Sequence, residues 1–305
     1  MQLTIGLLRS NWTAHCGNSV ACLSTRFFSA SCTPRDLVGL LPGVTIITFT
    51  FSYSFDIANQ AFSVEEDAIN KPDRPIVSGR LAIEGAYARW FLSWIMFPIL
   101  TYLMVDSSAA IILVLWELWI TVFYVWPKVD HWVARNIFTA LGAVLQLGLL
   151  DALLSEALPA YQVNNSLARL LFFWLIMTIH VQEFHDMEGD RATGRRTLPL
   201  LLGPRGQMVL RATTATVMVV TAVANLLRAR MFWGGSTHSM PADIIGLAGC
   251  HIASMIIAAI RLITMRWKEA DEVTYKYYYT LATYMMLLFH ANVEEYTGSY
   301  ESFVY

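Results

Sequence analysis

Eight long, continuous apolar segments constrain the fold of this 305-residue chain more than any other feature of its sequence. A helix needs about 20 mostly apolar residues to cross a bilayer, and each segment is close to that length. The segments cover residues 38–62, 87–105, 108–126, 133–153, 166–184, 207–227, 243–264 and 274–291. Because apolar and polar residues do not alternate within them, helices are favoured over a membrane β-barrel. The sequence therefore predicts an all-α, polytopic membrane helical bundle with eight spans.

The composition excludes several other classes of protein. Only 14% of the residues are charged and 56% are hydrophobic, whereas about a quarter are charged in an ordinary soluble domain. The formal net charge of −2 argues against a nucleic-acid partner. The four cysteines are too few for a disulfide framework in so long a chain. We expect membrane lipid around the bundle and find no sign of a protein partner.

The positive charges of the connecting segments predict the orientation of the bundle. Eleven Lys and Arg residues fall in connectors on one predicted side, and two fall on the other. Since cytoplasmic loops carry the excess of Lys and Arg, the side with eleven is predicted to be cytosolic. Two glycosylation sequons, at Asn11 and Asn164, fall on the opposite side. This arrangement indicates a multi-pass protein of the endoplasmic reticulum.

The first 36 residues differ from the rest of the chain. They include Arg9, Arg26 and Arg35, many Ser and Thr residues, and no acidic residue before Asp36. This composition is compatible with a disordered or amphipathic tail, a targeting segment or a weak additional span. We therefore divide the chain into an N-terminal tail of uncertain structure, residues 1–36, and one membrane domain, residues 37–305.

The connector after the first apolar segment begins with a row of polar residues. Asn59, Ser63 and Asp67 are spaced four residues apart, so they share one face if the helix continues through Asp67. Two prolines follow within eight residues and stop the helix, which leaves Lys71 and Arg74 beside its end. The pattern predicts a polar face followed by two cations.

The connector after residues 166–184 shows the same arrangement. Glu183, Asp186 and Asp190 are spaced three and four residues apart and share one helix face, and Arg191 follows directly. A single acidic helix end is usually solvated surface. Two with matching spacing, predicted on the same side of the membrane, favour a shared function.

A diphosphate held through Mg²⁺ suits this pair of motifs. Magnesium prefers oxygen ligands and bridges carboxylates to phosphate oxygens, while Arg and Lys bind phosphate directly. An apolar bundle below the polar mouth would accept a hydrocarbon chain. The residues therefore predict an enzyme that acts on an amphiphilic diphosphate.

The full motifs extend this prediction. From Asn59 to Gly79 the chain reads N-x3-S-x3-D-x-x-N-K-P-x-R-P-x-x-S-G, and from Asp186 to Pro199 it reads D-x3-D-R-x-x-G-R-x-T-L-P. Together they resemble the UbiA superfamily of intramembrane prenyltransferases, and the resemblance covers residues 38–291. It implies a helical bundle around a lipid-open cavity, in which two Asp-rich motifs bind Mg²⁺ and a prenyl diphosphate. Ionisation then gives an allylic cation that usually alkylates an acceptor.

This chain departs from the pattern of the superfamily at two points. The usual first motif is N-D-x-x-D-x-x-x-D, and here Gln60 and Ser63 replace two of its aspartates, for which Glu65 or Glu66 is a candidate substitute. The superfamily usually has nine spans, so the tail is a candidate for a ninth. Fungal members with Asn-Gln in this motif include UbiA-type terpene cyclases, the branch that this chain resembles.

The resemblance and the charges together assign roles to specific residues. The predicted catalytic residues are Asp67, Asp186 and Asp190, and the predicted metal ligands are Asn59, Asp67, Glu183, Asp186 and Asp190. The predicted substrate-binding residues are Asn59, Lys71, Arg74, Arg135 and Arg191. Cyclisation of geranylgeranyl or farnesyl diphosphate in secondary metabolism is the favoured reaction. Prenyl transfer to an aromatic or other small acceptor, transport, and an inactive homologue are the alternatives.

Overall fold

The computed structural model of the chain describes residues 2–9, 16–17, 19–20, 23–24, 33–129, 131–158, 161, 163, 165–234 and 240–304. In these residues all regular secondary structure is helical, which confirms the predicted fold class. The sequons at Asn11 and Asn164 lie outside the described residues.

Helices occupy all eight predicted segments. The long helices are α3 (Pro34–Phe62), α5 (Ile83–Met104), α6 (Ser107–Ile120), α7 (Trp132–Ala157), α8 (Asn165–Thr178), α10 (Leu198–Gly234), α11 (Ala242–Thr264) and α13 (Thr280–Val304). The short ones are α1 (Gln2–Leu8), α4 (Val64–Asn70), α9 (Glu183–Ala192) and α12 (Lys268–Val273). Two π-helical segments, η1 (Thr121–Val125) and η3 (Thr274–Tyr279), and a 3₁₀ segment, η2 (Ile179–Gln182), join them.

Six of these helical stretches, rather than eight, are long and apolar enough to cross a membrane within the described part of the chain. They are Arg35–Phe62, Ser107–Val125, Trp132–Ala157, Asn165–Ala192, Leu198–Met231 and Ala242–Thr264. The two predicted spans outside this set are the helix α5 and the η3–α13 stretch. Both contain charged residues, such as Arg89 in α5 and Lys276 in η3, as well as several Trp or Tyr residues, and together these lower the mean hydropathy. The chain is an integral, multi-pass membrane protein.

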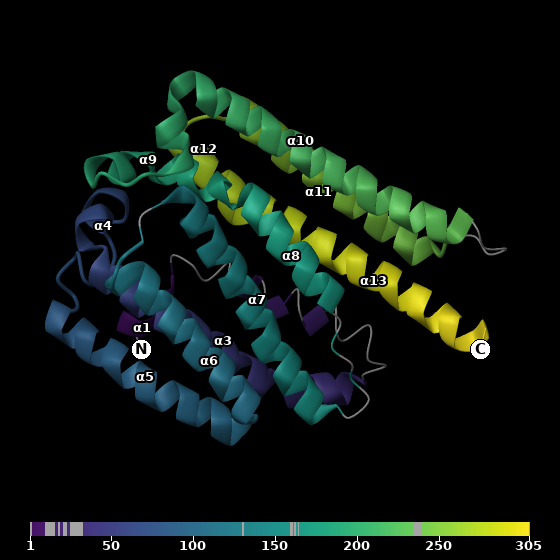
Figure 1. Ribbon diagram of the computed structural model, residues 1–305, viewed down its shortest axis with the longest axis horizontal. Helices are drawn as coiled ribbons and strands as arrows, with labels where there is room; N and C mark the ends of the chain where they lie inside the picture. The colour runs from purple at the N-terminus through teal and green to yellow at the C-terminus, as the bar shows by residue number, and fades with distance from the viewer. Residues whose placement is uncertain are drawn as a thin grey trace.

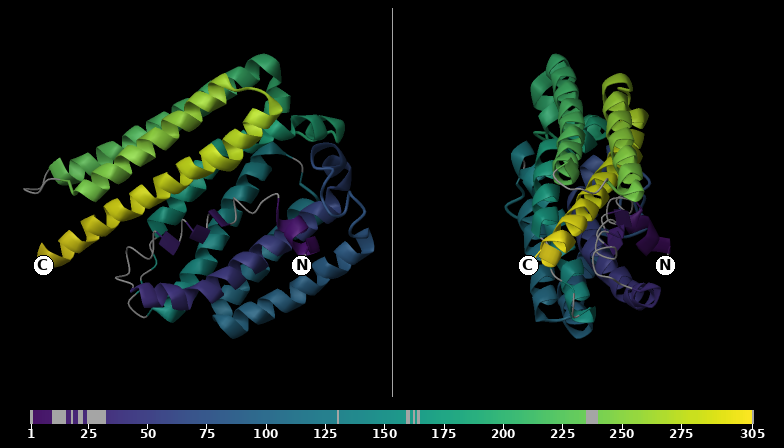
Figure 2. Two further views of the ribbon diagram at one scale, coloured as in Figure 1. Left: turned by 180° about the vertical axis from the view of Figure 1, so that it is seen from behind. Right: turned by 90° about the vertical axis from the view of Figure 1, so that its right-hand side faces the viewer.

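The long helices form two groups that lie side by side (Figure 1). Helices α3, α5, α6 and α7 pack consecutively in one group, and α10, α11 and α13 pack together in the other, with α8 between α7 and α13. The short helices α4, α9 and α12 gather at one end of the molecule, which the left view of Figure 2 shows from behind. The two acidic motifs are therefore at the same end, as predicted.

Polar and apolar residues are distributed as a lipid environment requires. Helix α5 exposes Phe91, Leu92, Ile95 and Met96, whereas the acidic residues of α4 and α9 are mostly turned inward. Large apolar side chains cost little against lipid, but charged ones are expensive there. The charged residues of the two acidic motifs are therefore mostly buried inside the bundle.

An aromatic cluster connects the first group of helices at its centre. The indole of Trp116 on α6 stacks on Phe51 of α3 at 4.4 Å between ring centroids and on Phe138 of α7 at 5.4 Å. Its Nε1 donates a hydrogen bond to the carbonyl oxygen of Phe51 at 3.0 Å. A Cβ at Gly142 would lie only 2.7 Å from the indole, so glycine is needed for Trp116 to lie against α7. This cluster forms a rigid wall.

The described part of the tail contacts the bundle. In α1, Leu7 and Leu8 are buried against α3, together with Ile57. Helix α1 has seven residues and lies beside α3, so it does not itself supply a ninth span.

Candidate active site

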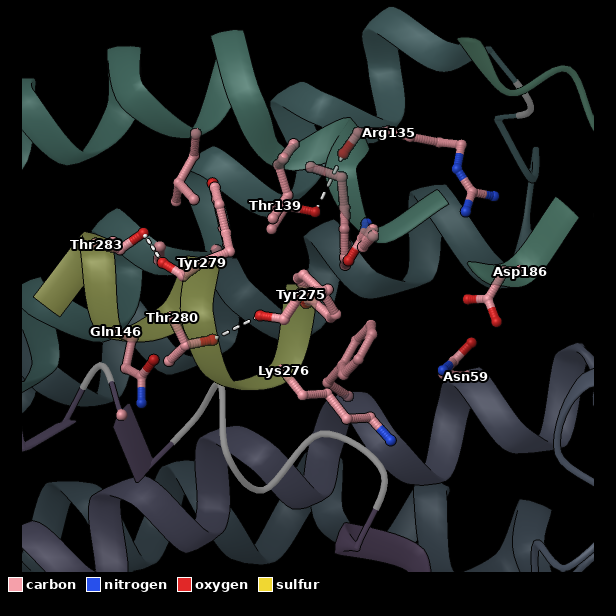
Figure 3. Close-up of a pocket in the computed structure, with 18 of the residues that line it drawn as sticks. Asn59, Arg135, Thr139, Gln146, Asp186, Tyr275, Lys276, Tyr279, Thr280 and Thr283 are labelled. Atoms are coloured by element: carbon pink, nitrogen blue, oxygen red, sulfur yellow. Dashed lines mark hydrogen bonds between the residues drawn. The ribbon is translucent and has the colours of Figure 1, made fainter. Parts of the chain in front are cut away.

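A cavity between the two groups of helices extends to the end where α4 and α9 lie. Its polar part is formed by Asn59, Glu66, Asp67, Lys71, Arg74, Arg135, Asp186 and Arg195. Its walls are largely aromatic and comprise Phe51, Phe55, Trp116, Tyr124, Phe138, Tyr275, Tyr279 and Tyr284. Figure 3 shows Asn59 and Asp186 close together at one end and Gln146 and Thr283 at the other. The cavity therefore joins a charged mouth to an aromatic interior.

Asn70 holds the two acidic motifs together. Its Nδ2 donates to the carbonyl oxygen of Asp186 at 3.1 Å, and its Oδ1 accepts from the backbone N–H of Gly189 at 3.1 Å. A Cβ at position 189 would lie 2.3 Å from this amide nitrogen. Glycine at 189 thus allows α4 and α9 to approach closely enough for both motifs to face one cavity.

Three of the predicted cations form ion pairs with predicted metal ligands, and two of these pairs lie at the cavity wall. The Nζ of Lys71 lies 3.2 Å from Oδ2 of Asp186, which links the two motifs. The Nη1 of Arg74 donates to both carboxylate oxygens of Asp67, at 2.6 and 2.7 Å, and both side chains are buried. Burial raises the pKa of the Asp67 carboxyl above its usual range, and the charge of Arg74 opposes this shift. Two cations and two carboxylates thus lie close together at the charged end of the cavity.

The other two acidic residues of the second motif lie deeper than the cavity wall. The Oε1 of Glu183 is 3.2 Å from Nε of Arg135, and its Oε2 accepts a hydrogen bond from the backbone N–H of Leu198 at 3.2 Å. Asp190 is fully buried, 3.6 Å from Nη1 of Arg195, and its oxygens accept no hydrogen bond from the described residues. Glu183 and Asp190 therefore support the mouth from behind.

Arg195, rather than the predicted Arg191, lines the cavity. Arg191 is exposed on α9. Arg195 forms an ion pair with Glu66 and donates to the hydroxyl of Ser63 at 3.1 Å, so it connects the second motif to the first. Its position in the G-R pair of the second motif was the signal for this role.

The altered positions of the first motif face different surroundings. Gln60 is fully buried and turned toward α1, where its Nε2 donates to the carbonyl oxygen of Leu7 at 2.7 Å. Glu65 is exposed, whereas Glu66 is buried and lines the cavity. Of the two candidate substitutes for the missing aspartates, Glu66 is the one whose side chain reaches the mouth.

Further cavity-lining residues were not predicted. Tyr275 and Lys276 of η3 line the cavity, as does His185, whose Nε2 lies 3.6 Å from Oδ1 of Asp186. The sequence signal for Lys276 was weak, because it is a single cation inside an aromatic run.

The donor set fits magnesium bound jointly by protein and substrate. The candidate ligands are all oxygen atoms, and the two carboxylate oxygens of Asp190, which accept no hydrogen bond from the described residues, lie behind the mouth. Among the described residues no three acidic, His or Cys side chains lie close enough to hold an ion alone. Magnesium commonly takes only one or two carboxylates and completes its shell with water and phosphate oxygens. Asn59, Asp67 and Asp186 line the mouth, where they could contribute oxygen ligands to such an ion.

Known proteins are similar to this chain in sequence and in fold. Residues 19–291 match the UbiA prenyltransferase family. The diterpene cyclase eriG of Hericium erinaceus is 31% identical over 160 residues, which are 52% of this chain and 51% of that relative, so this match spans about half the relative's length. The somaliensene A/B synthase of Streptomyces somaliensis is 29% identical over 76% of this chain and 74% of its own.

A transferase and a solved structure complete the comparison. The polyprenyl transferase eriF of Hericium erinaceus is 28% identical over 87% of this chain and 91% of its own. A UbiA homologue from Archaeoglobus fulgidus, bound to GPP and Mg²⁺, has a TM-score of 0.62 at 16% identity, covering 94% of this chain and 99% of that one. The resemblance found in the motifs is thereby confirmed. The chain belongs to the UbiA prenyltransferase family and is a UbiA-type membrane enzyme, of the kind that includes terpene cyclases and prenyltransferases.

Proposed function

We propose that this protein is a Mg²⁺-dependent terpene cyclase that ionises geranylgeranyl or farnesyl diphosphate and cyclises the resulting allylic cation. The observation that carries the proposal is one cavity with a charged mouth and aromatic walls. The mouth fits a diphosphate, and the walls fit a hydrocarbon chain.

The cations at the mouth bind and stabilise the leaving group. Lys71, Arg74 and Arg135 surround the space beside Asp186, and their charges neutralise the diphosphate as the C–O bond breaks. Stabilising a charge that develops in the transition state accelerates the reaction, whereas equal stabilisation of the bound substrate does not. We assign Arg195 to the same role in place of Arg191.

The acidic residues would hold the metal. Asn59, Asp67 and Asp186 would hold Mg²⁺ at the mouth, with Asp190 and Glu183 behind them. Bound magnesium would neutralise phosphate charge and make diphosphate a better leaving group. The ion pairs of Asp67 and Asp186 with Arg74 and Lys71 keep these carboxylates in position.

The aromatic walls protect and guide the cation. Phe55, Trp116, Tyr124 and Phe138 are packed against one another, so they form a fixed surface that excludes water. Cations are attracted to aromatic faces by about 0.5–2 kcal/mol per contact. A fixed aromatic surface thus favours folding of the prenyl chain onto itself over capture by water.

Prenyl transfer is the second candidate. Its support is the match to eriF, which covers more of this chain than the match to either cyclase. A transferase would need an acceptor next to the prenyl cation, whereas a cyclase would not.

Incubation without an acceptor tests the proposal. Membranes that contain the protein are supplied with Mg²⁺ and geranylgeranyl or farnesyl diphosphate, and the extracted hydrocarbons are analysed. We expect a cyclic terpene, which should disappear when the metal is chelated. Turnover that begins only after an aromatic acceptor is added would refute cyclisation and support transfer.

On the same proposal, residues 37–305 form the catalytic membrane domain, and both acidic motifs face the cytosol from the endoplasmic reticulum. The excess of Lys and Arg at their end of the bundle supports this orientation. A glycosylation sequon introduced beside Gly194 should remain unmodified. Glycan attachment there would contradict the orientation.

A further inference from the structure

Lys276 is a cavity-lining cation that belongs to neither acidic motif. It lies in η3, and its side chain extends along the cavity toward the end where Asn59 and Asp186 lie close together (Figure 3). The side chain lines the cavity and is 27% exposed, so its ammonium group is not sealed inside the protein.

The π-helical geometry of η3 places this residue. The hydroxyl of Thr280 donates to the carbonyl oxygen of Tyr275 at 3.2 Å. The ring of Tyr275 stacks on His185 at 5.7 Å, and His185 in turn contacts Asp186. Tyr275, which directly precedes Lys276, is thus held against the second motif. Single π-helical turns occur frequently at functional sites.

Lys276 differs from the other cavity cations in its acidic partner. Those cations pair with acids of the motifs: Lys71 with Asp186, Arg74 with Asp67, Arg135 with Glu183 and Arg195 with Glu66. Lys276 pairs with Glu272, four residues earlier at the end of α12, and the two side chains are 27% and 44% exposed. Partly exposed pairs at this spacing in a helix contribute little stability. Lys276 can therefore exchange its partner for a phosphate oxygen at small cost.

We propose that Lys276 is a further diphosphate-binding residue, which contacts the diphosphate of the prenyl substrate from η3. The inference rests on the proposed function and adds a cation from an element outside both motifs. A lysine is suited to this role because its ammonium group acts as a mobile point charge on phosphate.

Binding of inorganic pyrophosphate in the presence of Mg²⁺ tests the role directly. Calorimetry on the full-length protein in detergent compares the wild type with Lys276→Gln and Lys276→Arg. Loss of one charged hydrogen bond should weaken binding roughly tenfold in Lys276→Gln, and Lys276→Arg should recover most of it. The matched control is Lys268→Gln, whose lysine pairs with exposed Glu188 and does not line the cavity. It should bind pyrophosphate like the wild type.

A second variant separates ligand binding from a structural ion pair. Glu272→Gln breaks the same pair but leaves Lys276 in place, so it should bind pyrophosphate at least as tightly as the wild type. Equal weakening in Glu272→Gln and Lys276→Gln would instead assign the pair to structure and overturn the inference.

Two further results would refute the inference in distinguishable ways. If the wild type turns over prenyl diphosphate and Lys276→Gln retains its pyrophosphate affinity and its KM, the inference fails while the proposed function stands. If the wild type neither binds pyrophosphate nor consumes any prenyl diphosphate, the proposed function itself fails. Thermal unfolding of each variant without ligand shows whether its fold is intact.

Discussion

The two acidic motifs meet in one cavity but are built differently. In the second motif, Glu183, Asp186 and Asp190 all belong to the single short helix α9. In the first motif, Asn59 belongs to α3 and Asp67 to α4. Ser63 separates those two helices, with φ of −130° and ψ of 31°. The second motif is one rigid helix face, whereas the first is assembled across a break.

This difference explains how the first motif can lose two aspartates. The break at Ser63 directs Glu66 into the cavity, although Glu66 has no place in the usual spacing. Gln60, before the break, contacts α1 instead. Glu66 thus brings a negative charge to the mouth although it lies outside the helical spacing of the usual motif. We expect the second motif to tolerate substitution less than the first.

The largest effect is expected from the second motif. Replacing Asp186 and Asp190 together by Asn removes the carboxylate of Asp186 at the mouth and that of Asp190 behind it. Pyrophosphate release should fall by roughly a thousandfold or more, because leaving-group stabilisation is lost. The measurement is pyrophosphate release from geranylgeranyl diphosphate. Glu188→Gln, on the exposed side of α9, is the control, and a double variant within about tenfold of it would disprove the metal site.

A smaller loss of activity is expected at Asp67, together with a loss of stability. Asp67→Asn removes the carboxylate to which the buried guanidinium of Arg74 donates two hydrogen bonds. Removing one member of a buried pair costs about 3 kcal/mol or more, and activity should fall by roughly a hundredfold. Thermal unfolding in detergent and pyrophosphate release measure the two effects.

Asp73→Asn is the matched control for Asp67. Asp73 lies in the same connector but is exposed, 3.9 Å from exposed Arg9. Its replacement should change neither stability nor activity. If Asp67→Asn and Asp73→Asn have the same stability and activity, the Asp67–Arg74 pair does not contribute to either as proposed.

Substitutions of Glu65 and Glu66 test whether Glu66, which follows the helix break at Ser63, replaces one of the missing aspartates. Glu66→Gln weakens the contact with Arg195 and should lower kcat/KM about tenfold, whereas Glu65→Gln should change it less than twofold. A double-mutant cycle with Arg195→Gln measures the coupling between the two side chains. Additive effects, or a larger loss in Glu65→Gln, would show that Glu66 does not replace a lost aspartate.

Hydropathy and spacing alone were sufficient to predict much of this molecule. The positions of the eight helices follow from continuous apolar segments, and spacing placed Asp67, Lys71, Arg74 and Asp186 at one mouth. The number of spans was overestimated, because charged residues together with Trp and Tyr lower the mean hydropathy of two of the predicted segments.

The remaining residues depend on local backbone geometry that spacing does not encode. Glu66 faces the cavity because the helix breaks at Ser63, and Lys276 because η3 is π-helical. Arg195 reaches the mouth from beyond the end of α9, whereas Arg191 on the helix is exposed. Each exception follows a departure from regular α-helix, which changes the direction of every side chain after it.

The smallest effect on activity is expected at Gln60, and it sharpens the contrast between the motifs most directly. If position 60 still faced the metal, Gln60→Asp would restore the usual motif and lower the Mg²⁺ concentration required for half-maximal activity. Because Gln60 donates to the carbonyl oxygen of Leu7, an aspartate there would instead face an acceptor in a buried site. We therefore expect an unchanged Mg²⁺ requirement and a lower melting temperature. Gln60→Leu, which only removes the hydrogen bond, should cost about 1 kcal/mol and leave activity within about twofold. A reduced Mg²⁺ requirement in Gln60→Asp would mean that the first motif also presents a continuous face to the metal.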